Sequence, residues 1–349
     1  MIDSLTPQER KKAIREGRPY DRLQSWFTIE DVAAKLIGIS VAEFHLDPGK
    51  QIAATVAAHE RFEPDVVETV LPAAGILGHK MAFPEDRNPY VSETVVLEPR
   101  DFEGIHLYDP KTHPLFANFW RIVDGLFERL GGKTEIGILL GGPFTAAAQA
   151  IGVDNFLKKL KKDPGYVHLL VNAVTDVQIT AIRALKGYPV QFDIKDPVAS
   201  GTLIKPEDYR TFVKPYQTKL LKAMKETSPN DHVLHICGNT SKILNDMAET
   251  GADIVSIDNI LDLEFVKNEV GGKAAIMGNV KPTATMLLGS EEDVVEDLKQ
   301  CLKKAWDTPK SYVPAFGCGL PLGTPVKNLD ALYTAFRDFG RYPVNTARL

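Results

Sequence analysis

A histidine and a cysteine stand two residues apart in the stretch LHICGN, at the end of a short apolar run. Side chains alternate along a strand, so His235 and Cys237 are predicted to lie on one side of a strand at 233–236. Another cysteine, Cys318, lies between two glycines in AFGCGLPLGTP, directly after a second apolar run. One imidazole and two thiols are donors that suit zinc, and three protein ligands would leave a fourth position open for catalysis.

The H-x-C pair is a weak signal by itself, because buried free cysteines are common and most of them are inert. Simple packing is therefore the competing interpretation of His235 and Cys237. The third cysteine, Cys301, lies in the helical pattern EDLKQCLKKAW and is expected to pack there. Three cysteines do not form a disulfide framework, which favours a reduced, cytoplasmic protein.

The elements that must position these residues are short apolar strands that alternate with long amphipathic helices, a pattern typical of parallel β/α units. The predicted strands are 22–26, 66–71, 136–140, 190–194, 233–236, 254–257, 275–278 and 312–316. Helices are predicted at 155–162, 167–185, 206–226, 241–249, 291–305 and 328–339. Eight strands of this kind close a (β/α)8 TIM barrel. We therefore predict one α/β barrel domain over residues 1–349, with an N-terminal extension and a long excursion at 79–112 after the second strand.

Active sites in such barrels lie at the C-terminal ends of the strands. Further polar residues follow the predicted strands and are candidates for binding substrate or cofactor: Asp193, Asp196, Asn239, Asp258 and Asn279. Each is also compatible with a turn or a helix cap, as for Asp196 before a proline. The GGPFT segment at 141–145 could hold an anion at the start of a helix.

The bulk composition is that of an ordinary globular protein, with 349 residues of which 44% are hydrophobic and 25% charged. A net charge of −5 argues against a nucleic-acid partner. The uncharged run at 136–153 contains two glycines and a proline, so a strand, a turn and a helix start explain it better than a membrane span. The charged N-terminal segment has no apolar core of the signal-peptide type.

With these residues placed, the sequence resembles the uroporphyrinogen decarboxylase superfamily, and more closely its zinc-dependent methylcobamide:coenzyme M methyltransferase branch. The matching segments are GGPFTAAAQ (141–149), DPVASGTLIKPEDYRTFVKPY (196–216), LHICGNTSKILNDMAETGADIVSIDN (234–259), MGNVKPTATMLLGS (277–290) and GCGLPLGTPVKNL (317–329). The resemblance implies a barrel in which His235, Cys237 and Cys318 hold zinc.

The resemblance also implies an activity. It predicts a zinc-dependent cobalamin methyltransferase that moves a methyl group between a methylcob(III)amide and a zinc-activated thiol such as coenzyme M. The corrinoid is expected on a partner protein, because the chain lacks a D-x-H-x-x-G corrinoid motif. The five polar residues listed above would orient the histidine ligand, the substrate or the corrinoid edge. The sequence does not specify the thiol, and a homodimer is compatible with it.

Other functions stay open. The reverse half-reaction would move a methyl group from a methyl ether or sulfide donor to the corrinoid protein. A non-catalytic role would be binding of a corrinoid or tetrapyrrole. Decarboxylation is disfavoured, because decarboxylases of this family carry an arginine-rich N-terminal segment of the type F-M-R-Q-A-G-R, whereas residues 23–60 contain no arginine.

Overall fold

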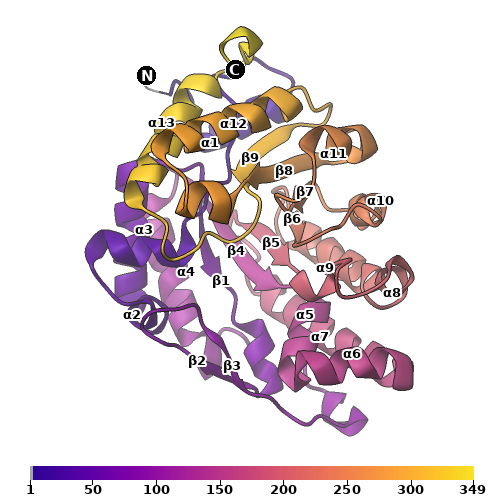
Figure 1. Cartoon of the computed structure of the whole chain (residues 1–349). Helices are drawn as coiled ribbons and strands as arrows, with labels where there is room; N and C mark the ends of the chain where they lie inside the picture. The colour runs from indigo at the N-terminus through magenta and orange to yellow at the C-terminus, as the bar shows by residue number, and fades with distance from the viewer. Residues whose placement is uncertain (1–2) are drawn as a thin grey trace.

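The computed structural model describes residues 3–349, and a curled parallel sheet lies at their centre (Figure 1). Within these residues the sheet has seven strands in the order β1-β4-β5-β6-β7-β8-β9, and all neighbours are parallel. The strands are β1 (Val66–Val70), β4 (Glu135–Gly141), β5 (Gln191–Lys195), β6 (Val233–Ile236), β7 (Ile254–Ile257), β8 (Ala275–Val280) and β9 (Tyr312–Phe316). They confirm the α/β class and seven of the eight predicted strands.

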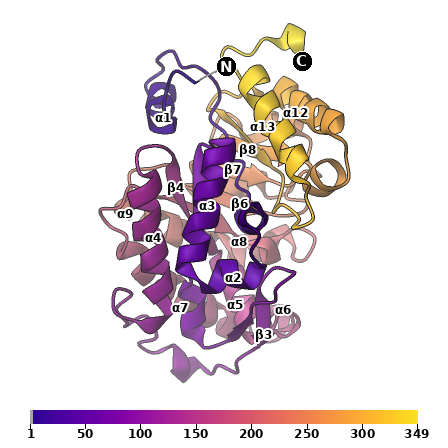
Figure 2. The ribbon, with the colours of Figure 1, turned by 90° about the vertical axis from the view of Figure 1, so that its left-hand side faces the viewer.

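Helices cover the outer face of the sheet, and α3 and α4 pack together along one flank (Figure 2). The helices are α1 (Pro7–Arg15), α2 (Val41–Leu46), α3 (Pro48–Phe62), α4 (Ala117–Leu130), α5 (Pro143–Ile151), α6 (Val153–Lys162), α7 (Pro164–Arg183), α8 (Pro206–Phe212), α9 (Lys214–Thr227), α10 (Leu244–Glu249), α11 (Leu263–Val270), α12 (Glu291–Ala305) and α13 (Val326–Phe339). Shorter helical turns span Glu30–Ile37, Ala73–Leu77, Pro99–Phe102, Pro114–Phe116, Pro197–Ala199, Pro282–Leu287 and Thr346–Arg348.

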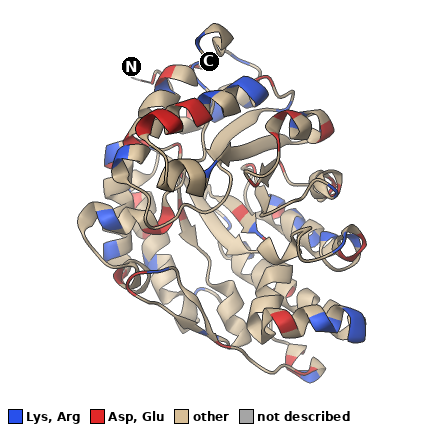
Figure 3. Ribbon diagram, in the orientation of Figure 1, with Lys and Arg blue, Asp and Glu red and all other residues tan. Residues whose placement is uncertain are grey.

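Helix α12 illustrates how the sequence sets these elements. Ser290 caps its N-terminus and pairs with Asp293 in a capping box, and acidic residues fill the first turn while lysines fill the last (Figure 3). This charge order complements the helix dipole. Val294, Leu298 and Leu302 recur every fourth residue and are buried against the rest of the core. The predicted and observed bounds of this helix are the same.

Two apolar layers hold the sheet in place. The larger cluster lies between the strands and the outer helices and extends along the chain from Leu23 to Val344. The smaller one fills the inside of the curl with Trp26, Val66, Val233, Ile254, Met277, Val313 and Ala315. Both faces of the strands are therefore buried, which explains their nearly continuous apolar sequences. The inner cluster also forms a dry floor below the C-terminal strand ends.

The predicted first strand at 22–26 is not a strand of the sheet, so an eight-stranded closed barrel is not confirmed. The segment makes only single bridges, from Arg22 to Arg341 and from Trp26 to Ala315 of β9. Its polar groups bind Asp65 instead, through the side chains of Arg22 and Ser25 and the Ser25 amide. The segment therefore crosses the open edge between β9 and β1, where side-chain contacts replace a strand ladder.

The uncharged run at 136–153 forms β4, a turn and α5, as the sequence indicated. Every helix within residues 3–349 is too short or too polar to cross a bilayer. The excursion after β1 contains a small antiparallel hairpin of β2 (Lys80–Ala82) and β3 (Tyr90–Glu93). It lies at the end of the molecule opposite α12 and α13 in Figure 1.

Candidate metal centre and active site

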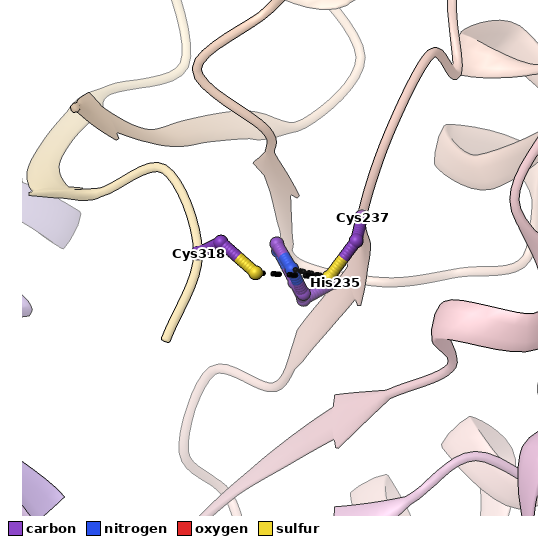
Figure 4. A group of neighbouring side chains, drawn as sticks. All are labelled: His235, Cys237 and Cys318. Atoms are coloured by element: carbon purple, nitrogen blue, oxygen red, sulfur yellow. Dashed lines mark hydrogen bonds between the residues drawn. The ribbon is translucent and has the colours of Figure 1, made fainter. Parts of the chain in front are cut away.

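His235, Cys237 and Cys318 lie together at the C-terminal end of the sheet (Figure 4). His235 is on β6, Cys237 follows that strand, and Cys318 follows β9. His235 Nε2 is 3.0 Å from Cys237 Sγ, which is 3.0 Å from Cys318 Sγ. One donor atom from each residue falls within 4.8 Å of the other two. Residues 81 positions apart in the chain thus converge on one point.

The histidine ring is buried and held from the neighbouring strand. His235 Nδ1 lies 3.0 Å from Ser256 Oγ, and the two residues are paired in the register of β6 and β7. When Nδ1–H donates to this hydroxyl, the lone pair of Nε2 faces the sulfur atoms. The sequence analysis did not single out Ser256, although it lies two residues before Asp258 and therefore on the same side of its strand.

A hydrogen bond between the two thiols shifts their pKa values in opposite directions. The bond to Cys237, helped by His235, lowers the pKa of Cys318 to about 4. The same bond, together with burial, raises the pKa of Cys237 far above its usual range. The contact allows either sulfur atom to be the donor. Both side chains are partly exposed, so a molecule at the strand ends can reach them.

A tight turn after Cys237 holds the first sulfur in place. Gly238 has a φ of +76°, and a Cβ atom there would lie 2.5 Å from Ser200 Oγ. Only glycine meets both conditions without strain. The Gly238 amide donates to Asp258 Oδ2 at 2.8 Å, and Oδ1 of the same carboxylate accepts from the Ile260 amide at 3.0 Å. Asp258 therefore lies beside the three-residue group and positions its loop.

The predicted anion position at the start of α5 is filled by the chain itself. Asp196 is fully buried, and its Oδ1 accepts hydrogen bonds from the amide and the hydroxyl of Thr145 at 2.8 and 2.6 Å. Its Oδ2 accepts from Gln217 Nε2 at 2.9 Å. A Cβ at Gly142 would overlap this carboxyl group. The fold uses both oxygens of Asp196, which corrects the expectation that they face a substrate.

The two predicted asparagines also have structural partners. Asn239 is exposed, and its Oδ1 accepts from the Ser241 amide at 3.1 Å in a turn. Asn279 donates to the carbonyl groups of Leu261 at 2.7 Å and Asp258 at 3.2 Å. Their hydrogen bonds fix loops around the group, so we assign them positioning roles in place of substrate contacts.

Asp193 differs from these residues because it points into the inside of the curl. Its side chain is fully buried and lines a small cavity together with Lys195, His235 and Cys318. Sequence reasoning missed Lys195, which is paired with His235 in the register of β5 and β6. It also missed Glu68 of β1. A carboxylate in the middle of the apolar run VVETV was the available signal for that residue.

The family of the chain follows from its sequence over nearly the whole length. A sequence model of the family described as uroporphyrinogen decarboxylase (URO-D) matches residues 6–339. The chain belongs to the URO-D family. All three members of the candidate metal centre and all strands of the sheet lie within the matched range. The resemblance found in the sequence motifs is thereby confirmed.

Similar URO-D family proteins include methyltransferases and decarboxylases. The methylated-thiol–coenzyme M methyltransferase of Methanosarcina mazei is 28% identical over 97% of this chain and 91% of its own length. The methylcobamide:CoM methyltransferase MtbA of Methanosarcina acetivorans is 28% identical over 97% and 99%. The uroporphyrinogen decarboxylase of Microcystis aeruginosa is 25% identical over 80% of each chain. The methyltransferases therefore match over a larger share of the chain.

A solved methyltransferase structure has the same fold as this URO-D family chain. The structure of a methyltransferase from Methanosarcina mazei superposes with a TM-score of 0.81 at 26% identity, and it covers 96% of this chain and 99% of its own. The curled parallel sheet is thus shared with a methyltransferase. These similarities support corrinoid-dependent methyl transfer as the class of reaction.

The residues of this URO-D family chain fit a zinc ion. Zn–S and Zn–N bonds of about 2.3 and 2.0–2.1 Å require donor atoms a few ångströms apart, and the three donors satisfy that distance. Two cysteine sulfur atoms and one imidazole are donors that suit zinc, and His235 Nε2 faces the sulfur atoms while Nδ1 contacts Ser256. A bound divalent ion would also displace the Cys237 proton. A tetrahedral zinc ion held by these three residues would have one position left for a substrate atom.

Proposed function

We propose that this protein transfers a methyl group between a methylcobamide, carried by a separate corrinoid protein, and a thiol held at His235, Cys237 and Cys318. The observation that carries the proposal is the convergence of one imidazole nitrogen and two sulfur atoms within 4.8 Å at the strand ends. The similarity to methylcobamide:CoM and methylated-thiol methyltransferases supports this reaction class.

Zinc at this position would supply a Lewis acid that lowers the pKa of a substrate thiol, so that the sulfur is a nucleophile near neutral pH. The chain's own residues then orient the reaction. Ser256 fixes the plane of His235, and the turn at Gly238 and Asp258 fixes Cys237. The floor of Trp26 and Met277 excludes water from below.

The proposed reaction is a nucleophilic displacement at the methyl carbon. The thiol sulfur attacks the methyl carbon, a sulfur–carbon bond forms, and the cobalt–carbon bond breaks with its electron pair left on cobalt. The proton of the thiol passes to solvent. Positioning the sulfur and the methyl group in line supplies most of the rate enhancement in such a reaction. A corrinoid protein would present its methyl group at the open end of the strands.

We further infer that residues 22–26 take the place of the eighth strand of a barrel, because Trp26 contacts β9 and Ser25 contacts Asp65 next to β1. The continuous core from Leu23 to Val344 supports a single domain. A cytoplasmic location remains a prediction, as does a homodimer.

The test uses purified protein with methylcobalamin and thiols, and it follows the absorbance of the cob(I)alamin product. We expect one zinc per chain and thiol-dependent demethylation. Cys318→Ala should lose both, whereas Cys301→Ala should keep both, because Cys301 is buried in α12 away from the group. Full activity of Cys318→Ala without zinc would contradict the proposal.

The same materials separate the two directions of transfer. Methylation of cob(I)alamin by methyl sulfides or methyl ethers, without turnover of methylcobalamin by any thiol, would favour the reverse half-reaction. The similarity to the methylated-thiol–coenzyme M methyltransferase makes methyl sulfides the first donors to try.

A further inference from the structure

Two buried carboxyl groups inside the curl lie near each other and have no hydrogen bond of good geometry within residues 3–349. Both oxygens of Asp193 are buried and unpartnered, and so are both carboxyl oxygens of Glu68. Burial raises the pKa of each group, and for Asp193 the neighbouring Glu68 carboxyl raises the pKa further against the opposing effect of Lys195. Unpaired buried polar groups are unfavourable for folding.

The sheet is built to bring the two groups together. Glu68 lies on β1 and Asp193 on β5, with β4 between them. Glu68 is paired with Gly137 of β4, and a Cβ atom at Gly137 would lie 2.8 Å from Glu68 Cγ. The missing side chain therefore leaves the space through which Glu68 reaches toward Asp193. Most of the sheet is uncharged, so this group of charges is unusual within it (Figure 3).

Glu68 lines a neighbouring cavity, whereas Asp193 shares a cavity with the candidate metal centre. Asp193 and Lys195 line one side of this cavity, and His235, Ser256 and Cys318 line the other. Trp26, Met277 and Phe316 complete its apolar wall. This cavity has a volume of about 30 Å³, enough for a small polar group such as an ammonium beside Asp193 but not for a whole substrate.

The charge of that wall is negative while at least one of Glu68 and Asp193 is ionised, although burial raises the pKa of both. Lys195 is its one cation, and its Nζ lies 2.5 Å from Glu30 Oε1 and 3.9 Å from Asp193 Oδ2. Burial alone would lower the pKa of Lys195, but the carboxylates around it raise the pKa above its usual value. One lysine thus faces Glu30, Glu68 and Asp193, a net charge of −2 when all are ionised and −1 when the pair shares a proton. Lys195 is already neutralised and is not free for an anion.

We infer that the substrate of the metal centre carries an amino or ammonium group at the end opposite its reacting atom, and that Asp193 binds this group, with the carboxyl group of Glu68 behind it. The inference rests on the proposed function and names its substrate class. An ammonium group supplies a hydrogen-bond donor to the carboxyl oxygens of Asp193, and the aromatic residues Trp26 and Phe316 of the cavity wall suit a cation. A sulfonate or carboxylate at the same place would meet like charge, which opposes binding strongly.

The test compares three thiols of equal length: 2-aminoethanethiol, 2-mercaptoethanol and 2-mercaptoethanesulfonate. Their binding to Co(II)-substituted protein is followed by the sulfur-to-cobalt absorption band, and their kcat/KM is measured with methylcobalamin. We expect the amine to bind at least about tenfold more tightly than the sulfonate, with the alcohol between them. Asp193→Asn and Glu68→Gln should each bring the amine-to-sulfonate ratio toward one.

Two further variants make the test specific. Gly137→Ala should displace Glu68 and reduce the preference without changing a charge. Glu135→Gln should keep the preference, because Glu135 is also a buried acid of the sheet but binds Lys11 and Gln24 at the opposite end of the strands. Tighter binding of the sulfonate, unchanged in Asp193→Asn and Glu68→Gln, would overturn the inference and leave the proposed function intact. Failure of all three thiols to bind or react with metal-loaded protein would overturn both.

Discussion

Ser256 Oγ lies 3.0 Å from His235 Nδ1, and the two residues are direct neighbours across β6 and β7. A hydroxyl at this position fixes the orientation of the ring, and it can accept from Nδ1–H when Nε2 binds a metal. The contact depends on strand pairing alone, since 21 residues separate the two in the chain. The pairing of β6 with β7 therefore sets the orientation of a candidate metal ligand at the end of the sheet.

Loss of this contact should weaken metal binding. Ser256→Ala removes the partner of a metal-binding histidine, and such changes lower metal affinity about 10- to 100-fold. Competition with a chromogenic chelator measures the zinc affinity. The control is Ser228→Ala, which removes another buried serine hydrogen bond, to the Val190 carbonyl at 2.6 Å, near the N-terminal end of the strands. Equal zinc affinity in wild type and Ser256→Ala would contradict a positioning role.

Gly238→Ala should disturb the turn that places Cys237. The left-handed φ of +76° costs a residue with a Cβ about 1–2 kcal/mol, and the new methyl group would also press on Ser200 Oγ. We expect a lower free energy of unfolding in urea and less bound zinc per chain. Gly272→Ala is the matched control, because a Cβ there has open space and no positive φ is required. Equal free energies of unfolding and equal zinc contents in Gly238→Ala and Gly272→Ala would contradict this prediction.

His232 should make stability depend on pH. The ring is fully buried; Nδ1 accepts from the Phe192 amide at 3.3 Å, and Nε2 lies 3.3 Å from the Ser228 carbonyl oxygen. Burial lowers the pKa of His232 from 6.5 to about 4. Between these values the unfolded chain binds a proton that the folded chain does not. Stability is therefore fully present above pH 6.5 and falls as the pH decreases toward 4.

The size of this effect is up to about 3 kcal/mol over the window, since one pKa unit corresponds to about 1.4 kcal/mol. Urea unfolding at pH 7, 6 and 5 would measure it. The variant His232→Gln lacks the titrating ring, so its free energy of unfolding should fall less steeply with decreasing pH. Parallel pH curves for the two proteins would rule out this origin of acid sensitivity.

Asp65 should hold the open edge of the sheet together. Its buried carboxylate binds Arg10 Nη1 at 2.7 Å and Arg22 Nη1 at 2.6 Å. Burial alone would raise the pKa of Asp65, but Arg22 and Arg10 keep it below its usual value. Asp65→Ala removes the fully buried carboxylate that both guanidinium groups share, although Arg10 keeps Asp21 and Arg22 keeps Asp3. The change should cost about 3–5 kcal/mol in the free energy of unfolding.

The exposed pair of Arg61 and Asp330, 2.7 Å apart, provides the comparison for this prediction. Asp330→Ala should cost less than about 1 kcal/mol, because water screens the pair. Urea denaturation of the two variants measures the difference. Similar losses in both would mean that the contacts of Asp65 do not secure residues 22–26.

The sequence by itself determined the strands whose apolar runs end in polar or glycine residues, such as 233–236 and 312–316, and the capped helix 291–305. It also determined that His235 and Cys237 share a side, because alternation along a strand is a local property. A local pattern could not show that 22–26 would leave the ladder. That outcome depends on Asp65, which lies 40 residues from Ser25 and takes its polar groups.

Only the tertiary structure decided which polar groups remain free at the strand ends. Asp193 and Asp196 belong to the same short stretch of the chain. Thr145 and Gln217 donate hydrogen bonds to Asp196, whereas the carboxyl oxygens of Asp193 have no partner among the described residues. The approach of Glu68 to Asp193 needs the strand order and the space above Gly137. Hydrogen-bond satisfaction and cavity shape depend on neighbours distant in sequence, so spacing along the chain cannot specify them.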